Sequence, residues 1–397
     1  MTRNPISTTA APISMRALLA GAHAKQPQLL DLTTRLVLAE SPSDDKAAVD
    51  ACMDLAATHA RALGGRVKRH KQKDYGDVLE LRFGSRNARS RILLLGHLDT
   101  VWPLGTLKTM PCRVGPDADG NSRLWGPGTL DMKTGVAMAF TAIEMLAEAK
   151  MLESEIVLLL NSDEEIGSPI SRPITEKLAQ ECAAVYVLEP AQGLAYKTSR
   201  KGTGNWRVTA HGLAAHAGVD FSRGRSAILE LARQIETISA WTDLKKGTTV
   251  SVGVIGGGTK SNVIPAEAWA EVDVRVAKRG DGPRIEKRFA ALKPTPKSGV
   301  SLVIEGGINR PPMERTRGTV QLLRRAQALA AQIDWQLAEA PTGGASDGNF
   351  TSALGIPTLD GMGAVGEGAH ATHESVLIEH LAPRTALLAA MLAPGHV

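Results

Sequence analysis

The sequence is poor in aromatic residues and in cysteine. Phe, Trp and Tyr together make up 4% of its 397 residues, which argues against a surface on which the bases of single-stranded nucleic acid stack. The three cysteines, Cys52, Cys112 and Cys182, lie far apart and form no CxxC pattern. We therefore expect free thiols in a reducing compartment, and no nucleic acid among the partners.

Long apolar runs are missing as well. No segment approaches the roughly 20 apolar residues that span a bilayer, so we expect no membrane partner. Near the N-terminus, Arg16 precedes a short apolar stretch, but His23 and Lys25 interrupt it. This pattern does not favour a signal peptide, and the cytoplasm is the expected location.

The residues that are present are typical of a globular α/β protein. Hydrophobic residues make up 43% of the sequence, with 39 Gly and 21 Pro, and the length predicts two domains. The net charge of +5 favours small anionic substrates. The one dense basic run, RVKRHKQK at residues 66–73, alternates like an exposed edge strand, and we interpret it as a solvated face rather than a nucleic-acid site.

Strands and helices alternate in the first half of the sequence. Apolar runs predict the strands, and longer segments with helix-start and helix-stop residues predict the helices. The expected strands are 77–83, 91–95, 155–160 and 183–188, and the expected helices are 44–63 and 131–149. This alternation predicts an α/β fold with a mainly parallel sheet and helices on both faces.

The middle of the sequence has a different rhythm. The expected order there is strand 205–210, helix 223–240, strands 249–254 and 267–276, helix 283–292 and strand 300–305. This β-α-β-β-α-β order is that of a ferredoxin-like module. The α/β rhythm then resumes, with helices near 316–332 and 379–392. We therefore expect one domain formed by residues 1–198 and 309–397, interrupted by a smaller inserted domain at 199–308.

Polar side chains lie where the predicted strands of the larger domain end. Ligands of parallel sheets bind beyond the carboxyl ends of the strands, so these residues are expected to share one rim. They are His97 and Asp99 after the second strand, Asp131 in a Gly-rich loop, Glu164 and Glu165 after the third strand, and Glu189 after the fourth. His370 and His373 follow near the C-terminus, in GEGAHATHE.

Each of these residues alone has an ordinary structural explanation, such as a hydrogen-bonded His, a helix-capping Asp or a solvated loop Glu. Together they indicate a cation, because several carboxylates on one rim repel one another unless a cation lies among them. Imidazole nitrogen and carboxylate oxygen suit zinc, and five ligands with one shared carboxylate suit two metal ions about 3.5–4 Å apart. Adjacent Glu164 and Glu165 point in different directions, so one can bind metal while the other acts as a general base. Asp99 shares a strand face with His97 and can fix its tautomer.

The motifs that carry these residues make the sequence resemble a known family. They are GHLDTVWPLGT, GPGTLDMKTG, NSDEEIGS, VLEP, GLAAHAG, KSNVIPAEAWAEVDVR and GEGAH, in that order. Over nearly its whole length past about residue 25, the sequence resembles the dizinc metallopeptidase family of glutamate carboxypeptidase, aminoacylase and acetylornithine deacetylase. The first three motifs are most similar to those of the bacterial glutamate (folate-hydrolysing) carboxypeptidases.

The resemblance implies a role for each residue of the rim. Asp99 would orient His97. Glu164 would be the general base that takes a proton from the attacking water and passes it to the leaving amine. Two zinc ions would be bound, with cobalt or manganese as possible substitutes. Their ligands would be His97 and Glu189 for one ion, Glu165 and His370 for the other, and Asp131 as the bridge between them.

The resemblance also implies that the inserted domain acts as a lid and dimerisation domain. His216 would stabilise the tetrahedral oxyanion, often from the neighbouring subunit of a homodimer, whereas alone it would be interpreted as a turn histidine. Asn262 and Arg275 would bind the substrate carboxylate; the alternative for Arg275 is a surface ion pair. Gly344, in the loop TGGASDGN, would allow close approach of the backbone to the substrate. Further candidates for contact with an acidic side chain are Lys197, Arg200, Lys201 and Arg310.

Two positions depart from the family pattern. At the first, Met132 follows the bridging aspartate, where this branch often has Asp. The resemblance itself implies that the peptide bond after this aspartate, between Asp131 and Met132, is cis. The segment HATHESV supplies a second histidine and lacks the usual aromatic residue. We favour His370 over His373 as the ligand because it directly follows the GEGA turn.

The function implied by the resemblance is metal-dependent hydrolysis of an amide bond in a small peptide or N-acyl amino acid. We expect release of a C-terminal amino acid, glutamate or another acidic residue. The alternative is removal of an N-acyl group, as in acetylornithine deacetylase or aminoacylase. A binding protein without catalytic activity is not favoured, because Glu164 and every expected ligand are present.

Overall fold

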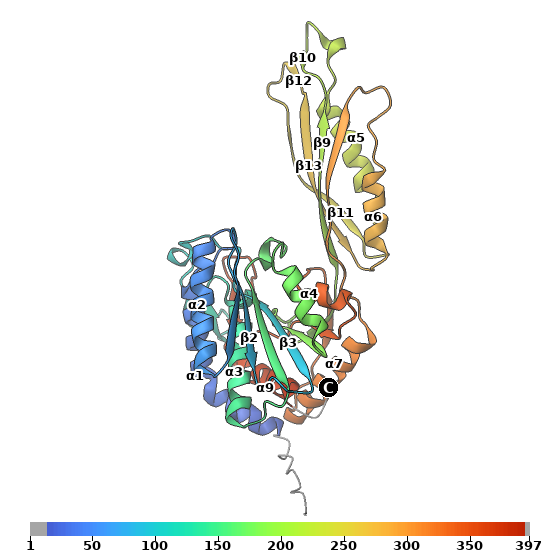
Figure 1. Cartoon of the computed structure of the whole chain (residues 1–397). Helices are drawn as coiled ribbons and strands as arrows, with labels where there is room; N and C mark the ends of the chain where they lie inside the picture. Colours follow the sequence, from blue (N-terminus) through green and yellow to red (C-terminus); the bar gives the residue numbers. More distant parts are fainter. Residues whose placement is uncertain (1–13, 394–397) are drawn as a thin grey trace, which may run out of the picture. The chain divides into compact units, whose positions relative to one another are not determined.

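The computed structural model describes residues 14–393, and Figure 1 shows the whole chain. The described chain divides into two compact units, the first made of residues 14–198, 316–340 and 354–393 and the second of residues 199–315 and 341–353. The domain limits expected from the sequence, 1–198, 199–308 and 309–397, stay a prediction, and residues 1–13 and 394–397 lie outside the described part. None of the helices in the described chain is both long enough and apolar enough to cross a membrane.

The first unit is built on a six-stranded sheet. Its strands are, in spatial order, β1 (Arg66–His70), β2 (Val78–Phe83), β6 (Glu155–Asn161), β3 (Arg91–His97), β7 (Ala184–Val187) and β16 (Thr358–Leu359). The strands from β6 to β16 are parallel to one another, whereas β1 and β2 join the edge in antiparallel pairing. The mainly parallel sheet predicted from the sequence is confirmed.

Helices cover both faces of this sheet (Figure 1). One face packs into the main core with α1 (Met15–Leu38), α2 (Lys46–Ala62), α3 (Thr134–Glu148), α7 (Arg317–Ala330) and α9 (Leu381–Leu392). The other face packs against α4 (Arg172–Gln180). Successive strand residues alternate between the two cores: Leu94 and Leu158 belong to the first, and Leu93 and Leu95 to the second. The central strands β3, β6 and β7 are therefore buried on both sides of the sheet.

The helix expected from residue 131 begins later, at Thr134, which corrects the sequence-based limit. Asp131 and Met132 have non-helical backbone angles, and the peptide bond between them is cis, as expected. Lys133, directly before α3, is 1% exposed, and its Nζ donates to the carbonyl oxygens of Leu36 and Ala39, each at 2.9 Å. Burial lowers the pKa of the Lys133 amine. This contact ties the last turn of α1 to the loop that carries Asp131.

Four short strands bring two distant loops of the first unit together. They form an antiparallel sheet in the order β17 (Gly366–Glu367), β18 (Ser375–Leu377), β5 (Ser122–Trp125) and β4 (Arg113–Pro116). The loop at residues 368–374 connects β17 to β18, and residues 126–131 follow β5 directly. Because β18 pairs with β5, these two loops lie side by side.

The second unit has the predicted β-α-β-β-α-β order. Its elements are β9 (Gly202–His211), α5 (Ala227–Ser239), β11 (Thr249–Gly257), β13 (Glu267–Val276), α6 (Asp281–Ala290) and β14 (Ser301–Arg310). The sheet is antiparallel in the order β11-β13-β9-β14, and Trp206 stacks on Phe289 of α6 at 4.3 Å between ring centroids. The shorter elements of the chain are β8 (Tyr196–Arg200), β10 (Ala215–His216), β12 (Val263–Ile264), β15 (Glu339–Thr342) and α8 (Gly348–Ala353).

Residues 66–70 of the basic run form the edge strand β1, and side chains of the run make ion pairs as well as facing solvent. Lys68 lies 3.2 Å from a carboxylate oxygen of Glu80, and Arg69 lies 3.4 Å from one of Asp77. Burial disfavours the charged forms of both carboxylates, but hydrogen bonds from neighbours such as the Gln72 amide and the Arg82 guanidinium prevail. The pKa of Asp77 and that of Glu80 are each lowered to about 2.

We expect these two carboxylates to make the fold sensitive to acid. Their folded-state pKa values lie below the ordinary values of 3.8 and 4.5, so in this range the unfolded chain binds more protons than the folded one. The stabilisation is complete above about pH 4.5 and is lost as the pH falls towards 2. Thermal unfolding midpoints measured at pH 6, 4 and 3 should therefore fall more steeply for the wild type than for Asp77→Asn. Equal slopes would contradict the assignment.

Candidate metal centre

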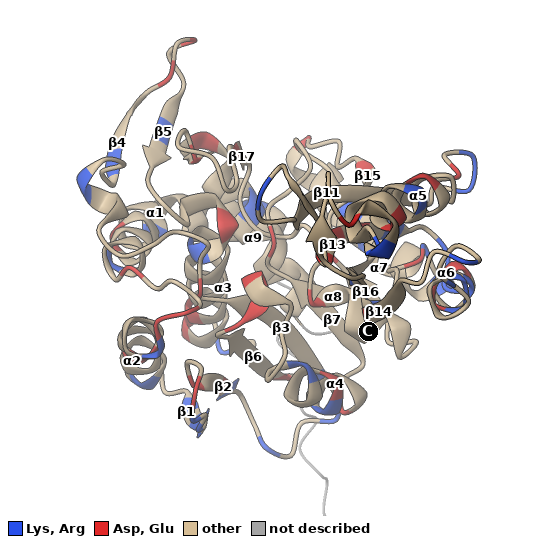
Figure 2. Cartoon of the chain, turned by 90° about the horizontal axis from the view of Figure 1, so that it is seen from above, with Lys and Arg blue, Asp and Glu red and all other residues tan. Residues whose placement is uncertain are grey.

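Acidic and imidazole side chains gather beyond the carboxyl ends of the parallel strands. His97 is the last residue of β3, Glu189 lies two residues after β7, and Glu165 lies in a short helical turn after β6. Asp131 precedes α3, and His370 lies in the loop between β17 and β18. Figure 2, which colours Asp and Glu red, shows acidic segments beside the ends of β3 and β6 and near the start of α3.

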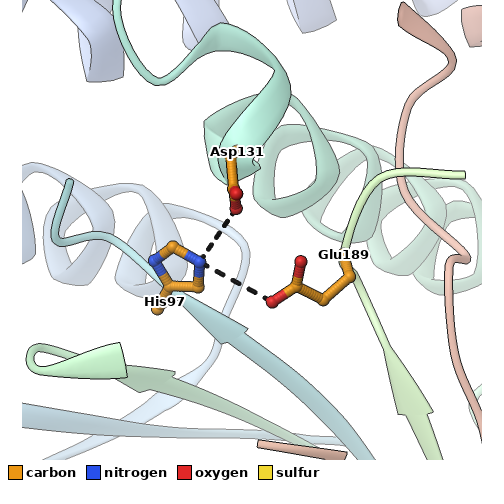
Figure 3. Close-up of side chains that lie close together, drawn as sticks. All are labelled: His97, Asp131 and Glu189. Atoms are coloured by element: carbon orange, nitrogen blue, oxygen red, sulfur yellow. Dashed lines mark hydrogen bonds and ion pairs between the residues drawn. The ribbon is translucent and has the colours of Figure 1, made fainter. Parts of the chain in front are cut away.

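One group of possible ligands consists of His97, Asp131 and Glu189 (Figure 3). The Nε2 atom of His97 lies 3.2 Å from Oδ1 of Asp131 and 3.8 Å from Oε1 of Glu189. His97 is 1% exposed and Glu189 7%. These three atoms therefore converge in a nearly dry position.

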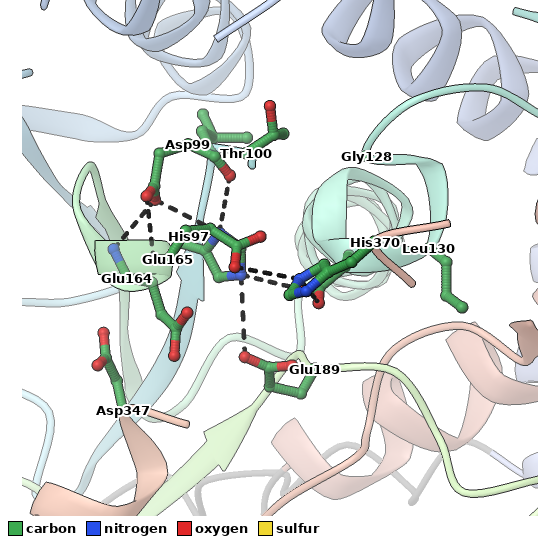
Figure 4. A network of polar contacts seen from close by, with 12 residues as sticks. His97, Asp99, Thr100, Gly128, Leu130, Glu164, Glu165, Glu189, Asp347 and His370 are labelled. Carbon is green, nitrogen blue, oxygen red and sulfur yellow. Dashed lines mark hydrogen bonds and ion pairs between the residues drawn. The ribbon is translucent and has the colours of Figure 1, made fainter. Parts of the chain in front are cut away.

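The second group consists of Asp131, Glu165 and His370 (Figure 4). The Nε2 atom of His370 lies 3.3 Å from Oδ2 of Asp131 and 3.1 Å from Oε2 of Glu165. Asp131 thus directs one carboxylate oxygen to each group. In the part of the chain that the structure describes, Oε1 of Glu165 is buried and has no hydrogen-bond partner.

The two groups fit zinc in donor type and in spacing. With zinc–ligand bonds of about 2.0–2.2 Å, the ligand atoms of a tetrahedral site lie roughly 3.3–3.6 Å apart. In each group the three ligand atoms lie within 4.8 Å of one another, and the contacts given above fall between 3.1 and 3.8 Å. A cation would also satisfy the buried oxygen of Glu165.

The pKa values of His370 and Glu165 also favour a cation at this centre. Hydrogen bonds to Asp131 and Glu165 raise the pKa of His370 to about 10. Burial raises the pKa of Glu165, and the nearby negative charge of Asp131 adds to this. These directions are consistent with carboxylates that lie close together beside a half-exposed histidine, a charge arrangement that a divalent cation would offset.

Comparison with known proteins identifies the family. The family described as peptidase family M20/M25/M40 matches residues 93–393. This chain belongs to that family. The resemblance inferred from the motifs is therefore confirmed, and the protein is a metal-dependent hydrolase of the peptidase and amidohydrolase type.

Individual relatives of this M20 hydrolase cover nearly its whole length. Carboxypeptidase G2 of Pseudomonas sp. (strain RS-16) is 28% identical over 384 residues, which cover 94% of this chain and 91% of the relative. Succinyl-diaminopimelate desuccinylase of Stenotrophomonas maltophilia (strain R551-3) is 26% identical over 369 residues, which cover 89% and 95%. The solved structure of aminopeptidase PepT from Bacillus cereus has a TM-score of 0.73 at 22% identity, covering 92% of this chain and 98% of its own, and shows the same fold.

Asp99 contacts the M20 centre through its backbone oxygen and through its carboxylate. The Nδ1 atom of His97 lies closest to the backbone oxygen of Asp99, at 3.0 Å, and 3.4 Å from its carboxylate. The carboxylate instead accepts hydrogen bonds from the backbone N–H groups of Glu164, at 3.2 Å, and Glu165, at 3.1 Å, and from the Ser43 hydroxyl, at 2.7 Å. Asp99 therefore holds the backbone of the Glu164–Glu165 turn as well as the His97 ring.

Glu164 and Glu165 leave this turn in different directions, as expected (Figure 4). Glu165 reaches His370, whereas Glu164 belongs to neither group of possible ligands. Of the two C-terminal histidines, the structure brings His370 into the second group and leaves His373 outside both. The roles of these residues remain proposals.

Glu374, for which the sequence indicated no role, has a carboxylate that contacts the loop carrying Asp131. This side chain is completely buried and accepts a hydrogen bond from the Asp131 backbone N–H at 3.0 Å. The only signal in the sequence was an acidic residue four positions after His370, directly before the apolar strand β18.

The expected substrate-binding residues lie in the second unit. His216 is exposed, and its Nδ1 accepts from the backbone N–H groups of Gly218 and Val219 at 3.1 and 3.2 Å. Asn262 is exposed, and its backbone oxygen accepts from the Ala217 N–H at 3.0 Å. The last contact and the pairing of β10 with β12 place His216 and Asn262 on neighbouring segments of the chain.

The basic candidates of the second unit have internal partners. Arg275 donates from Nη2 to Asp273 at 2.8 Å, and the Asp273 carboxylate also accepts from Nε. Arg310 forms an ion pair with Asp347 at 2.8 Å. Arg200 donates to the carbonyl oxygen of Gly344 at 3.3 Å, so the Gly344 loop is held by a buried guanidinium.

Proposed function

We propose that this M20 hydrolase is a dizinc carboxypeptidase that releases a C-terminal amino acid, glutamate or another acidic residue, from a small peptide or N-acyl substrate. The observation that carries the proposal is the position of Asp131, whose two oxygens face two different histidines. A carboxylate in this position suits a pair of metal ions better than a single one. The relative named carboxypeptidase G2, aligned over 94% of this chain, supports the reaction class.

Five side chains would hold the metal ions. When bound, the two ions would supply a Lewis acid for the amide carbonyl and an acidified water as the nucleophile. Zinc is proposed because the donor set combines imidazole with carboxylates, although cobalt or manganese suits the same donors. The proposed ligands are His97, Asp131 and Glu189 for one ion and Asp131, Glu165 and His370 for the other.

Glu164 would move the proton. Its carboxylate would take a proton from the attacking water and donate it to the nitrogen of the leaving amine. The turn that carries Glu164 is anchored by two N–H bonds to the Asp99 carboxylate, so the base sits on a fixed backbone. A fixed position matters because a general base must stay within hydrogen-bond distance of the proton that it abstracts.

The second unit would bind the substrate. The Nδ1 atom of His216 accepts two backbone N–H groups, so the neutral ring carries its proton on Nε2, where it could donate to the oxyanion. Asp273 occupies the Nε–Nη2 edge of Arg275, and we propose that Arg275 binds a substrate carboxylate through its Nη1 side. Asn262 lies beyond the opposite end of β13, so within one subunit these two residues do not meet at one carboxylate as the sequence led us to expect. Gly344 would border the substrate pocket. We also propose that the protein forms a homodimer through this unit, because β11 and β14 are edge strands of its sheet and could pair with a second copy. The proposed location is the cytoplasm.

A second candidate function is N-acyl amino acid deacylation. It is favoured by the similarity to succinyl-diaminopimelate desuccinylase, which covers 89% of this chain. The same ligands and the same general base would serve this reaction, since both cleave an amide. The two functions differ in which side of the bond the enzyme binds.

A substrate panel with controlled metal content tests the proposal. The chelated protein is expected to be inactive and to regain activity with zinc, releasing glutamate or aspartate from C-terminal peptides and folate-type glutamates. Amino acid release is measured by chromatography, with Arg275→Gln as the variant that should raise KM for acidic substrates. Zinc-dependent activity restricted to N-acetyl, N-succinyl or N-benzoyl amino acids would replace the carboxypeptidase by the deacylase. No zinc-dependent cleavage in either group would contradict both.

A further inference from the structure

We infer that Glu374 is a positioning residue that fixes the distance between Asp131 and His370 and thereby sets the affinity of the second metal position. The inference rests on the proposed dinuclear centre. Glu374 lies outside both groups of possible ligands, and it touches them only through backbone and through its own loop. The geometry of these contacts carries the argument.

The Glu374 carboxylate accepts four N–H hydrogen bonds. Its Oε1 accepts from the backbone of Leu130 at 2.8 Å and of Asp131 at 3.0 Å. Its Oε2 accepts from the backbone of Gly128 at 2.9 Å and from the Trp102 indole at 2.8 Å. Among residues 14–393 no ion pair of this carboxylate is seen, so the four N–H groups are its direct polar contacts.

The loop before α3 needs such an acceptor. Gly128 has a left-handed backbone (φ 72°), and Asp131 is not helical, so their N–H groups have no helical carbonyl to bond. Leaving these donors buried without an acceptor would cost about 1–3 kcal/mol each. One carboxylate with four lone-pair positions meets this need, and it fixes where the Asp131 backbone lies.

The other end of Glu374 is tied to His370. In the connecting turn, the Glu374 N–H donates to the Ala371 oxygen at 2.9 Å, and the Ala371 N–H donates to the Gly368 oxygen at 2.8 Å. Gly368 has φ 78°, and a Cβ there would lie 2.8 Å from the His373 ring, so the turn has little room to change. His370 lies between Gly368 and Ala371 in this turn, so its backbone position depends on the same hydrogen bonds.

These contacts close a ring around the second metal position. From Asp131 Oδ2 the ring runs 3.3 Å to His370, through the turn to Glu374, and 3.0 Å back to the Asp131 N–H. The first metal position is supported by other contacts. His97 is carried by β3, and the backbone carbonyl oxygen of Glu189 accepts from the Gly363 N–H at 2.9 Å. A change at Glu374 should therefore affect the second position more than the first.

The test is a zinc titration of metal-free protein against a chromophoric chelator, for the wild type and for Glu374→Gln. In the variant, an amide NH₂ group replaces one of the two carboxylate oxygens, each of which accepts two N–H groups. The new NH₂ donor would then face two N–H donors with no acceptor between them. The expected result is a loss of affinity for the second zinc equivalent by about 10–100-fold, with the first equivalent much less affected. Glu374→Asp, which keeps the charge, should recover part of the loss.

A matched control is Glu367→Gln, which changes an acidic residue of the same segment whose side chain is 57% exposed and pairs with Arg123. It should bind both equivalents as the wild type does. If Glu374→Gln fails to fold, Trp102→Phe removes one donor only and should weaken the second equivalent by about 2–10-fold.

Three outcomes separate the inference from the proposal on which it rests. Unchanged affinities in Glu374→Gln, or equal losses at both positions in a folded variant, would overturn the positioning role. Unchanged affinities in Trp102→Phe would do the same where the first variant does not fold. A wild type that binds fewer than two equivalents would instead overturn the dinuclear centre.

Discussion

Replacing Glu164 with glutamine is expected to lower kcat by about 10²–10⁴-fold, the range typical for loss of a general base. Glutamine keeps the shape of the side chain but cannot accept and release the proton. The backbone N–H bonds to Asp99 do not involve the Glu164 side chain, so the turn should keep its position. Steady-state kinetics on the best substrate of the panel measures the effect.

The metal content is the control for this variant. Glu164 belongs to neither group of possible ligands, so elemental analysis should find the same zinc content in Glu164→Gln as in the wild type. The KM should change little if the side chain acts mainly in the transition state. Near-normal turnover with full metal content would mean that the base is another residue.

The second large effect is expected from Asp131→Ala, which should lose both zinc ions. Each oxygen of Asp131 faces a different histidine, so removal of this one side chain takes a ligand from both groups. Loss of a metal ligand lowers zinc affinity more than loss of a contact that supports a ligand. The zinc affinity of each metal position should therefore fall by more than about 100-fold. Equilibrium dialysis followed by elemental analysis measures the zinc that remains.

His97→Ala and His370→Ala provide the comparison for this prediction. Each removes a ligand from one group only, so each variant should retain about one zinc ion with near-normal affinity. Two equivalents retained by Asp131→Ala would contradict the shared carboxylate. Loss of both ions from either histidine variant would show that the two positions do not bind independently.

The sheet and the clustering of possible ligands were predictable because they depend on short-range sequence signals. Apolar runs mark β3, β6 and β7, and the polar residues that follow them must meet, since parallel strands end at the same edge. His97, Glu165 and Glu189 could therefore be grouped from the sequence. Asp131 joined this group as the aspartate of a Gly-rich loop at the same rim, whereas its role as the shared ligand and the role of His370 as a ligand came from the resemblance to the family. The comparisons confirm the family itself.

The supporting contacts could not be predicted, because they join backbone groups that are distant in the sequence. Glu374 bonds the Gly128 N–H across 246 positions, and nothing in either segment marks the other as its partner. The Asp99 carboxylate likewise bonds backbone amides 65 and 66 positions away. Hydropathy patterns carry information about side chains, whereas these contacts depend on where irregular backbone directs its N–H groups.

The buried Lys133 gives the N-terminal helix a part in the hydrolase site. Lys133 lies two residues after Asp131, and its ammonium donates to the carbonyl oxygens of Leu36 and Ala39 at the end of α1. A protein shortened past residue 39 would lose both acceptors and the helix that packs beside them, so the Lys133 amine would have to bond water or release its proton. The boundary of the catalytic scaffold therefore lies upstream of residue 93, where the family match begins, and includes α1.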